Sequence, residues 1–424
     1  MSNTAINKRV ISFALFCFVL IVSFSCMMFS SGSNVMAAPA DESTQEIRVI
    51  SINLCCDQDD IEKRGPILLN MFLDMDPDVI GTQENGLEYS AWMQLFKEYF
   101  PNYGRIGKSG EGLVESRKIM ANYIYYNADR YECLEWDTQW LGPKTRCIAR
   151  TFTGNYPSTV TWGIFRDKES GFKFAHVNCH TIYNNEEENY KQMVIVADMV
   201  EQFAAAGMPV FATGDYNTSE GSEAYQNMMS RPGVGDPKYL TSDTVFSGSY
   251  RGWGYRDLSG GRSIDFCFVS KDTMTVNKYD IIETYAQGMG LSDHNAVYVS
   301  ANIKYFDDAA KNAEAEHKLN LDIEVLDSST RAYVHELHFS QVSDVKSIFY
   351  YIGEIYDKSG KLIDSRMIRT NNLDQEIPED KYLTFGALDP DTDYTVKLYG
   401  CTIAGTKSLP YEYKITTMPE DIMR

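Results

Sequence analysis

The stretch TGDYNTSEG at residues 213–221 combines residue types that suit phosphate chemistry. It follows the apolar run PVFA, so the pattern predicts a buried strand that ends at Thr213. Asp215 and Asn217 lie two residues apart, and in an extended segment their side chains would point the same way. Asp215 can ligate a hard cation or hold a water, and Asn217 can donate to a phosphate oxygen while staying neutral. An Asp-x-Asn turn that caps a following helix is the alternative interpretation.

Similar polar side chains recur at or near the ends of the other predicted strands. In chain order the whole set is Asn53, Glu84, His180, Asp215 with Asn217, Asp265 and the pair Asp293-His294. Ends of strands in one sheet converge, so these groups are expected to meet. A histidine near two carboxylates can act as a general acid or base, and Glu84 offers an oxygen ligand that suits magnesium or manganese. Each residue alone also has a structural explanation, such as a turn for Asp293.

Hydrophobic periodicity predicts the elements that would position these groups. Strands are expected over 47–54, 77–84, 122–133, 159–167, 171–182, 261–270 and 291–303, and helices over 65–76, 86–100 and 188–206. This alternation indicates an α/β layer arrangement. Residues 222–262 are expected to form surface loops that shape the site. Within them, Trp253 and Tyr255 suit stacking on a base or insertion into a membrane surface, with ordinary loop packing as the alternative.

The N-terminal 40 residues have the pattern of a secretory signal. Lys8 and Arg9 precede a long apolar run, and Ala38-Pro39-Ala40 offers a small-residue cleavage site. An uncleaved membrane anchor is the alternative, and we expect a secreted or cell-surface protein in either case. Loss of the segment takes the formal charge from −20 to −22, because it carries these two cations and no acid. So acidic a chain has no general basic face for nucleic acid, and a phosphate substrate must meet a local site with a bound cation.

The chain changes character after residue 303. Residues 304–317 are polar and alanine-rich and are expected to be a linker or a short helix, with the first domain at 41–303. Residues 318–418 show strand alternation, with Tyr394, Val396 and Leu398 facing a core. A tyrosine after a proline-containing corner suits the tyrosine corner of β-sandwiches, and this part resembles a fibronectin type III module. Such a module would bind a cell-surface or matrix ligand, and we expect 41–303 to fold without it.

The order of the polar motifs resembles the endonuclease/exonuclease/phosphatase superfamily over residues 45–303. The matching motifs are Asn53 at a strand end, Gln83-Glu84, Asn178-Cys179-His180, Gly214-Asp215-Tyr216-Asn217, Asp265 in SIDFCFVS, and Ser292-Asp293-His294. As an ordered set they are far more specific than any one of them. One departure is Met120, which stands where many members carry a second glutamate.

The resemblance implies a four-layer α/β/β/α sandwich, followed by the smaller all-β, immunoglobulin-like sandwich of fibronectin type III type. It implies hydrolysis of a phosphoester by in-line attack of water, with one or two divalent cations, Mg²⁺ or Mn²⁺. Carried over by residue, Glu84 binds the cation, with Asn53 and Asp293 beside it. Asp215 orients or deprotonates the water, while Asn217 and His180 hold the phosphate. His294, paired with Asp293, is a second acid or base, and Asp265 supports it.

Three functions stay open from the sequence. The first is a monomeric, secreted nuclease-like phosphodiesterase, with Asn178, Trp253 and Tyr255 as substrate-binding residues. The second is an enzyme for phosphate esters of lipid head groups, inositol or other small organic molecules, similar to a sphingomyelinase. The third is a binding or adhesion protein that has lost catalysis, to which Met120 would point.

Overall fold

The computed structural model describes residues 44–55, 60–86, 90–108, 121–143, 158–245, 247–252, 261–342, 347–369 and 380–420. The predicted signal, Met120, Trp253 and Tyr255 lie outside these residues. Among the residues described, no helix is both long enough and apolar enough to cross a membrane.

The first part of the chain forms two sheets. The seven-stranded sheet has, in spatial order, β10 (Thr244–Val245), β12 (Met274–Ile282), β15 (Ala296–Lys304), β1 (Thr44–Asn53), β2 (Val79–Gln83), β4 (Tyr123–Asn127) and β3 (Tyr103–Ile106). The six-stranded sheet has β5 (Tyr131–Trp140), β6 (Thr159–Asp167), β7 (Lys173–His180), β8 (Val210–Asp215), β11 (Asp265–Ser270) and β9 (Val234–Gly235). The helices are α2 (Ile61–Met75), α3 (Ala91–Tyr99), α4 (Glu186–Ala205), α5 (Glu223–Met229) and the short 3₁₀ helix η1 (Pro237–Tyr239), and β13 (Tyr285–Ala286) pairs with β14 (Met289–Gly290).

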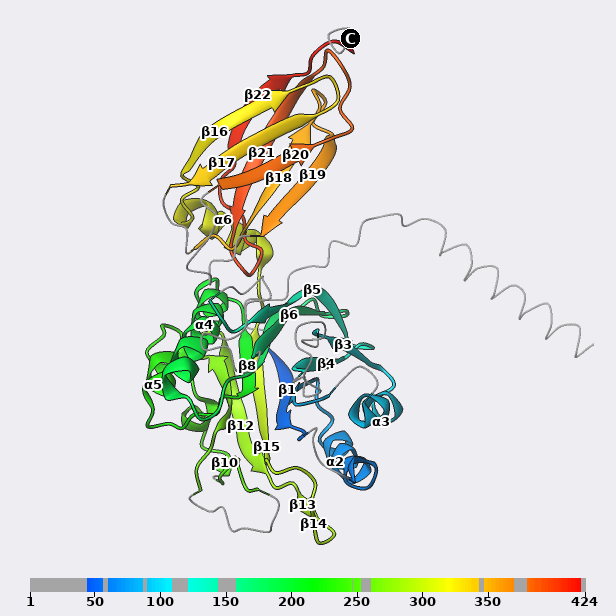
Figure 1. Cartoon of the computed structure of the whole chain (residues 1–424), viewed down its shortest axis with the longest axis vertical. Coiled ribbons are helices and arrows are strands. Elements are labelled where there is room, and N and C mark those ends of the chain that lie inside the picture. The colour runs from blue at the N-terminus through cyan, green and yellow to red at the C-terminus, as the bar shows by residue number, and fades with distance from the viewer. Residues whose placement is uncertain are drawn as a thin grey trace, which may run out of the picture. The chain divides into compact units, whose positions relative to one another are not determined.

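The two sheets pack face to face between layers of helices. Along β1, Ile47 and Val49 point into the core between the sheets, whereas Ile50 and Ile52 pack with residues of α2 and α3. On the far side, α4 packs on the outer face of the six-stranded sheet, where Met193 shares a buried cluster with Val177. Figure 1 shows α2 and α3 on one side of the paired sheets and α4 and α5 on the other. These four layers are the architecture that the resemblance implies.

Two predictions about this part are wrong. Residues 122–133 do not form one strand but divide into β4 and β5, which belong to different sheets. The chain turns because the side-chain oxygen of Asn127 accepts hydrogen bonds from the backbone N–H groups of Asp129 and Arg130. Residues 222–262 are not loops throughout, since α5 begins after Ser222, whose hydroxyl caps it by accepting from the N–H of Tyr225 at 3.1 Å.

The second part begins with a helix and continues as two further sheets. Its elements are α6 (Asp308–Lys318), β16 (Ile323–Thr330), β17 (His335–Gln341), β18 (Tyr350–Tyr356), β19 (Leu362–Arg369), β20 (Asp380–Phe385), β21 (Asp393–Cys401) and β22 (Tyr411–Thr416). Sheets β16-β17-β20 and β19-β18-β21-β22 share one apolar core. The hydroxyl of Tyr394 accepts a hydrogen bond from the N–H of Asp389 at 2.8 Å, as a tyrosine corner requires. Assignment of this module to the fibronectin type III group stays a prediction.

Apolar contacts join the second part to the first. Phe349 meets the ring of Trp162 edge-on at 5.9 Å between centroids, and Ile403 belongs to the same buried cluster. A chain cut after residue 303 would therefore lose these contacts to Trp162, and independent folding of residues 41–303 stays a prediction.

Candidate active site

The pairing of strands brings the predicted polar residues to one edge of the two sheets. Asn53 ends β1 and pairs with Gln83 of β2, so Glu84 leaves the sheet beside it. In the other sheet, His180 pairs with Asp215, and Asp215 also pairs with Asp265. Residues 292–294 lie just before β15, separated from it by Asn295, and β15 runs antiparallel to β1.

Asp215 is the centre of this edge. One of its oxygens, Oδ2, accepts a hydrogen bond from the side-chain amide of Asn53 at 3.0 Å and lies 3.3 Å from Nε2 of His180. The same oxygen is 3.8 Å from Nε2 of His294, and the second oxygen accepts from the backbone N–H of Asn217. Asp215 is 2% exposed, so these contacts form away from bulk water. Groups from both sheets therefore meet at a single carboxylate.

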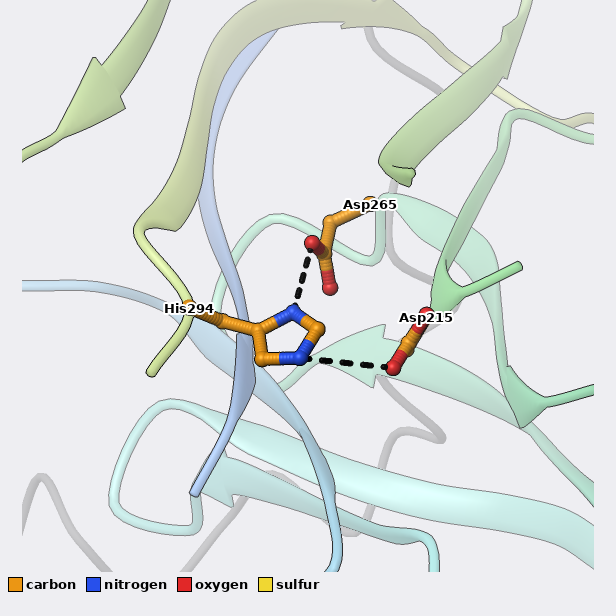
Figure 2. Close-up of side chains that lie close together, drawn as sticks. All are labelled: Asp215, Asp265 and His294. Carbon is orange, nitrogen blue, oxygen red and sulfur yellow. Dashed lines mark hydrogen bonds and ion pairs between the residues drawn. The ribbon is translucent and has the colours of Figure 1, made fainter. Parts of the chain in front are cut away.

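His294 lies between two aspartates. Its Nδ1 is 2.8 Å from Oδ2 of Asp265, and its Nε2 faces Asp215 (Figure 2). Burial alone would lower the pKa of His294, but the nearby charges of Asp265 and Asp215 outweigh it and raise the pKa to about 10. Burial also raises the pKa of Asp265. The two aspartates therefore favour the protonated, imidazolium form of the ring.

The group Asp215, Asp265 and His294 is close enough to hold a cation, because their ligand atoms lie within 4.8 Å of one another. An imidazolium has no lone pair for a metal, so a cation here would have to displace a proton from His294. Oδ1 of Asp265 is buried and has no hydrogen-bond partner in the described part of the chain. It is an oxygen that a cation or a water could satisfy.

A second set of oxygen ligands lies around Cys55. Burial raises the pKa of the Cys55 thiol, and the carboxylates of Asp293 and Glu84 raise it further, so both acids are near the sulfur. Oδ1 of Asp293 is buried without a hydrogen-bond partner among the described residues, and Glu84 accepts from the amide of Asn53 at 3.2 Å. Carboxylate oxygens and one amide fit Mg²⁺ or Mn²⁺, and no proton has to be displaced from a histidine. Glu84, Asp293 and Asn53 are the cation ligands that the resemblance implies, whereas Asp215, Asp265 and His294 are the group of ligand atoms that the described structure brings close together.

Two of the predicted site residues have surroundings that the sequence did not suggest. The side-chain amide of Asn178 donates to the carbonyls of Thr82 and Tyr123, and its oxygen accepts from Gln83, so it links the two sheets in the core. Asn217 adopts a left-handed conformation with φ 46°, because β8 ends at Asp215, and its amide donates to the carbonyl of Thr181. The argument from extended geometry therefore does not apply to Asn217. The two substrate-contact candidates Trp253 and Tyr255 lie outside the described residues.

The partners of the two histidines are distant in sequence. His294 meets Asp265 and not the adjacent Asp293, and His180 meets Asp215 and not Asn178. Nδ1 of His180 is buried and has no hydrogen-bond partner in the part of the chain that the structure describes. Met120, at the position of the usual second glutamate, lies outside that part.

Three residues at this edge had no role assigned to them from the sequence. Cys55 is a buried thiol that adjoins the candidate cation ligands. The hydroxyl of Ser292 donates to the carbonyl of Asn53 at 2.6 Å and accepts from the N–H of His294. The guanidinium of Arg64, in α2, donates to the backbone carbonyl of Cys55 in the same region. For Ser292 the motif Ser-Asp-His was the available signal, whereas nothing in the helical pattern around Arg64 indicated burial.

Comparisons with known proteins agree with this geometry. The sequence profile of the Endonuclease/Exonuclease/phosphatase family matches residues 51–294, more than half of the chain. No curated protein sequence matches the chain.

Solved structures with the same fold include three from two Bacteroides species. One is an endonuclease/exonuclease/phosphatase family protein from Bacteroides thetaiotaomicron, with 22% identity and a TM-score of 0.54 over 62% of this chain and 99% of that chain. A mannosyl-6-phosphatase from the same organism has 24% identity and a TM-score of 0.54 over 60% and 99%. A family protein from Bacteroides vulgatus has 21% identity and a TM-score of 0.52 over 61% and 100%. The chain belongs to the endonuclease/exonuclease/phosphatase family, whose members are hydrolases that act on phosphoesters and use divalent metals.

Proposed function

We propose that this chain is a divalent-metal-dependent phosphoesterase that hydrolyses phosphodiester bonds, as a nuclease does. One observation carries the proposal. Asn53, His180 and His294 converge on the buried carboxylate of Asp215, and Asp265 contacts the other ring nitrogen of His294. Proton acceptors and donors are thus placed together at the end of two sheets, as in-line attack by water needs.

Each residue has a role in the proposed reaction. Asp215 accepts a proton from the attacking water, and Asn53 orients that carboxylate through its amide. His180 and Asn217 donate to the phosphoryl oxygens, and the imidazolium of His294 donates a proton toward the leaving oxygen. A Mg²⁺ or Mn²⁺ ion held by Glu84, Asn53 and Asp293 would polarise a phosphoryl oxygen.

A second candidate is hydrolysis of a small phosphate ester, such as a sugar phosphate, an inositol phosphate or a lipid head group. The formal charge of −20 favours it, because a long polyanion is repelled by an acidic protein whereas a small ester is repelled less. A structural relative that is a mannosyl-6-phosphatase is also consistent with a small substrate.

The test is a substrate panel with the purified full chain. Bis(p-nitrophenyl) phosphate is assayed with Mg²⁺, with Mn²⁺ and with EDTA, followed by DNA, RNA, sphingomyelin, inositol phosphates and mannose 6-phosphate. Metal-dependent cleavage of the diester and of DNA or RNA is the expected result. Turnover confined to monoesters or to sphingomyelin would select the second candidate. No turnover of any ester would leave a binding protein on a hydrolase fold.

We also propose that the protein is exported as a monomer and that residues 318–418 bind a cell-surface or matrix ligand. The segment before residue 41 and the module pattern after residue 318 support this. N-terminal sequencing of protein recovered from the producing cells would give the mature start, which we expect after residue 37 or 40.

A further inference from the structure

Arg64 is an arginine in the interior of the first part of the chain. It lies in the first turn of α2 and is 2% exposed. Its guanidinium lies over the ring of Trp92, with 4.9 Å between the Cζ atom and the ring centroid. A charged group so deeply buried requires hydrogen-bond acceptors at close range, so its partners indicate its role.

The guanidinium donates to backbone carbonyls from two separate segments. Nη2 donates to the carbonyl of Cys55 at 2.6 Å, and Nη1 donates to those of Leu54 at 3.0 Å and Leu291 at 2.6 Å. Leu54 and Leu291 are far apart in sequence, and Nη1 bonds both. One planar group therefore fixes the distance between the segment after β1 and the segment before β15.

These two segments carry opposite sides of the candidate site. Leu54 and Cys55 directly follow Asn53, whereas Leu291 is followed by Ser292, Asp293 and His294. The hydroxyl of Ser292 makes a second link, to the carbonyl of Asn53. Movement of either segment would change the spacing between the proposed cation ligands and the position of His294.

We propose that Arg64 is a positioning residue of the active site, which holds the cation ligands on the two segments at the spacing needed for metal binding and turnover. The proposal rests on the function proposed above. Lysine cannot replace arginine here, because one ammonium lacks the planar fork that reaches three carbonyls. Methionine would keep the apolar stem against Trp92 and lose all the donors.

The test compares Arg64→Met and Arg64→Lys with Arg130→Met, a matched control. Arg130 is also an arginine that bridges two segments, but it bonds Asp78 and Asp167 at the other end of the strands. Each full-length variant is measured for melting temperature, for Mn²⁺ affinity by calorimetry, and for kcat and the Mg²⁺ concentration that gives half-maximal rate on bis(p-nitrophenyl) phosphate.

For Arg64→Met we expect Mn²⁺ affinity to fall about 10-fold or more, as when a group that supports metal ligands is removed. We expect kcat to fall about 100-fold, because a misplacement of about 1 Å is enough for that loss. Arg64→Lys should lie between this variant and the wild type. Arg130→Met should melt at a lower temperature with kcat and Mn²⁺ affinity within about twofold of wild type, since its contacts lie away from the site.

Wild-type kcat and Mn²⁺ affinity in folded Arg64→Met would overturn the proposal, as would equal losses in Arg130→Met. If Arg64→Met does not fold, the same criteria apply to Arg64→Lys, which keeps the charge. The two proposals fail separately, because Mn²⁺ affinity needs no turnover. A wild type that cleaves no ester but binds Mn²⁺ more tightly than the Arg64 variants would overturn the hydrolase proposal and leave Arg64 as a positioning residue of a metal site.

Discussion

The two ends of β2 hold acidic residues in opposite surroundings. Asp78 lies just before the strand, where Arg130 bonds it at 2.7 Å and also bonds Asp167 at 2.8 Å. The hydroxyl of Tyr131 donates to Asp78 as well. We call this the arginine end. At the arginine end, each buried carboxylate has a permanent cation beside it.

The opposite end of β2 is the candidate active site. In the described part of the chain, Asp215 and Asp265 form ion pairs with histidines and with no arginine or lysine. An oxygen of Asp265 and one of Asp293 remain without hydrogen-bond partners among those residues. Acids that are paired with arginine stabilise a fold, whereas acids left with titratable or absent partners can move protons or bind a cation. The partners of the carboxylates, more than the number of carboxylates, therefore distinguish the candidate active site from the arginine end.

The largest expected effect is on turnover at the site end. His180→Ala and His294→Ala should each lower kcat by about 10²–10⁴-fold, because each removes a donor or proton carrier. Binding of substrate should change less. Turnover of bis(p-nitrophenyl) phosphate by folded protein is the measurement. His176→Leu is the control, since His176 is buried in β7 and bonds Thr213. If folded His176→Leu loses as much kcat as the two alanine variants, the reacting groups do not lie at the His180 end of β7.

The next effect concerns the cation. Mg²⁺ at about 100 times its dissociation constant should add about 2.7 kcal/mol to the free energy of unfolding, and Glu84→Gln should remove most of that gain. Thermal unfolding with Mg²⁺ and with EDTA measures it. Glu62→Gln, an exposed change on α2, should keep the full Mg²⁺ response. A Glu84→Gln variant with unaltered response and turnover would move the cation to Asp215, Asp265 and His294.

The sequence predicted which residues form the site better than it predicted which of them contact one another. Asn53, Glu84 and Asp215 could be found because strand periodicity places them at strand ends, and strand ends of one sheet converge. The residues alone could not give the contact between His294 and Asp265, which only the resemblance implied. His294 lies before β15 of one sheet and Asp265 begins β11 of the other, so the contact depends on how the two sheets pack.

Burial of charged residues was the other feature beyond the sequence. Arg64 stands in the stretch IEKR, which has the pattern of an exposed helix face, yet it lies in the interior. Its burial follows from the positions of two distant backbone segments. The division of 122–133 into β4 and β5 was accessible, because Asn-Ala-Asp-Arg contains turn-forming residues.

A smaller effect is expected at the arginine end, on stability alone. Arg130→Met leaves Asp78 and Asp167 without their shared cation, and should lower the free energy of unfolding by about 2 kcal/mol. Arg130 is about one-third exposed, so water can replace part of its contacts and limits the loss. Urea unfolding measures the change, and kcat is measured beside it. A variant that keeps its stability but loses kcat would mean that the arginine end contributes to turnover, against this prediction.

The smallest effect is a pH dependence from His176, which lies between the two ends. Burial lowers the pKa of His176 to about 3, so the folded state cannot accept the proton that the unfolded chain binds below about pH 6.5. Because the unfolded state binds more protons between pH 6.5 and 3, stability falls as pH falls through that window. At pH 5.5 the loss relative to pH 8 should be about 1.4 kcal/mol.

His294 has the opposite sign, and this makes the pH test specific. Its raised pKa of about 10 means that its contribution is fully present below pH 6.5 and is lost only as pH rises toward 10. Between pH 8 and 5.5, the free energy of unfolding of His176→Leu, measured with urea, should therefore fall by about 1.4 kcal/mol less than that of the wild type. Its pH dependence above pH 8 should be the same as that of the wild type. Equal acid losses in the variant and the wild type would mean that His176 takes up its proton in the folded state, and the core between the sheets would then be open to water.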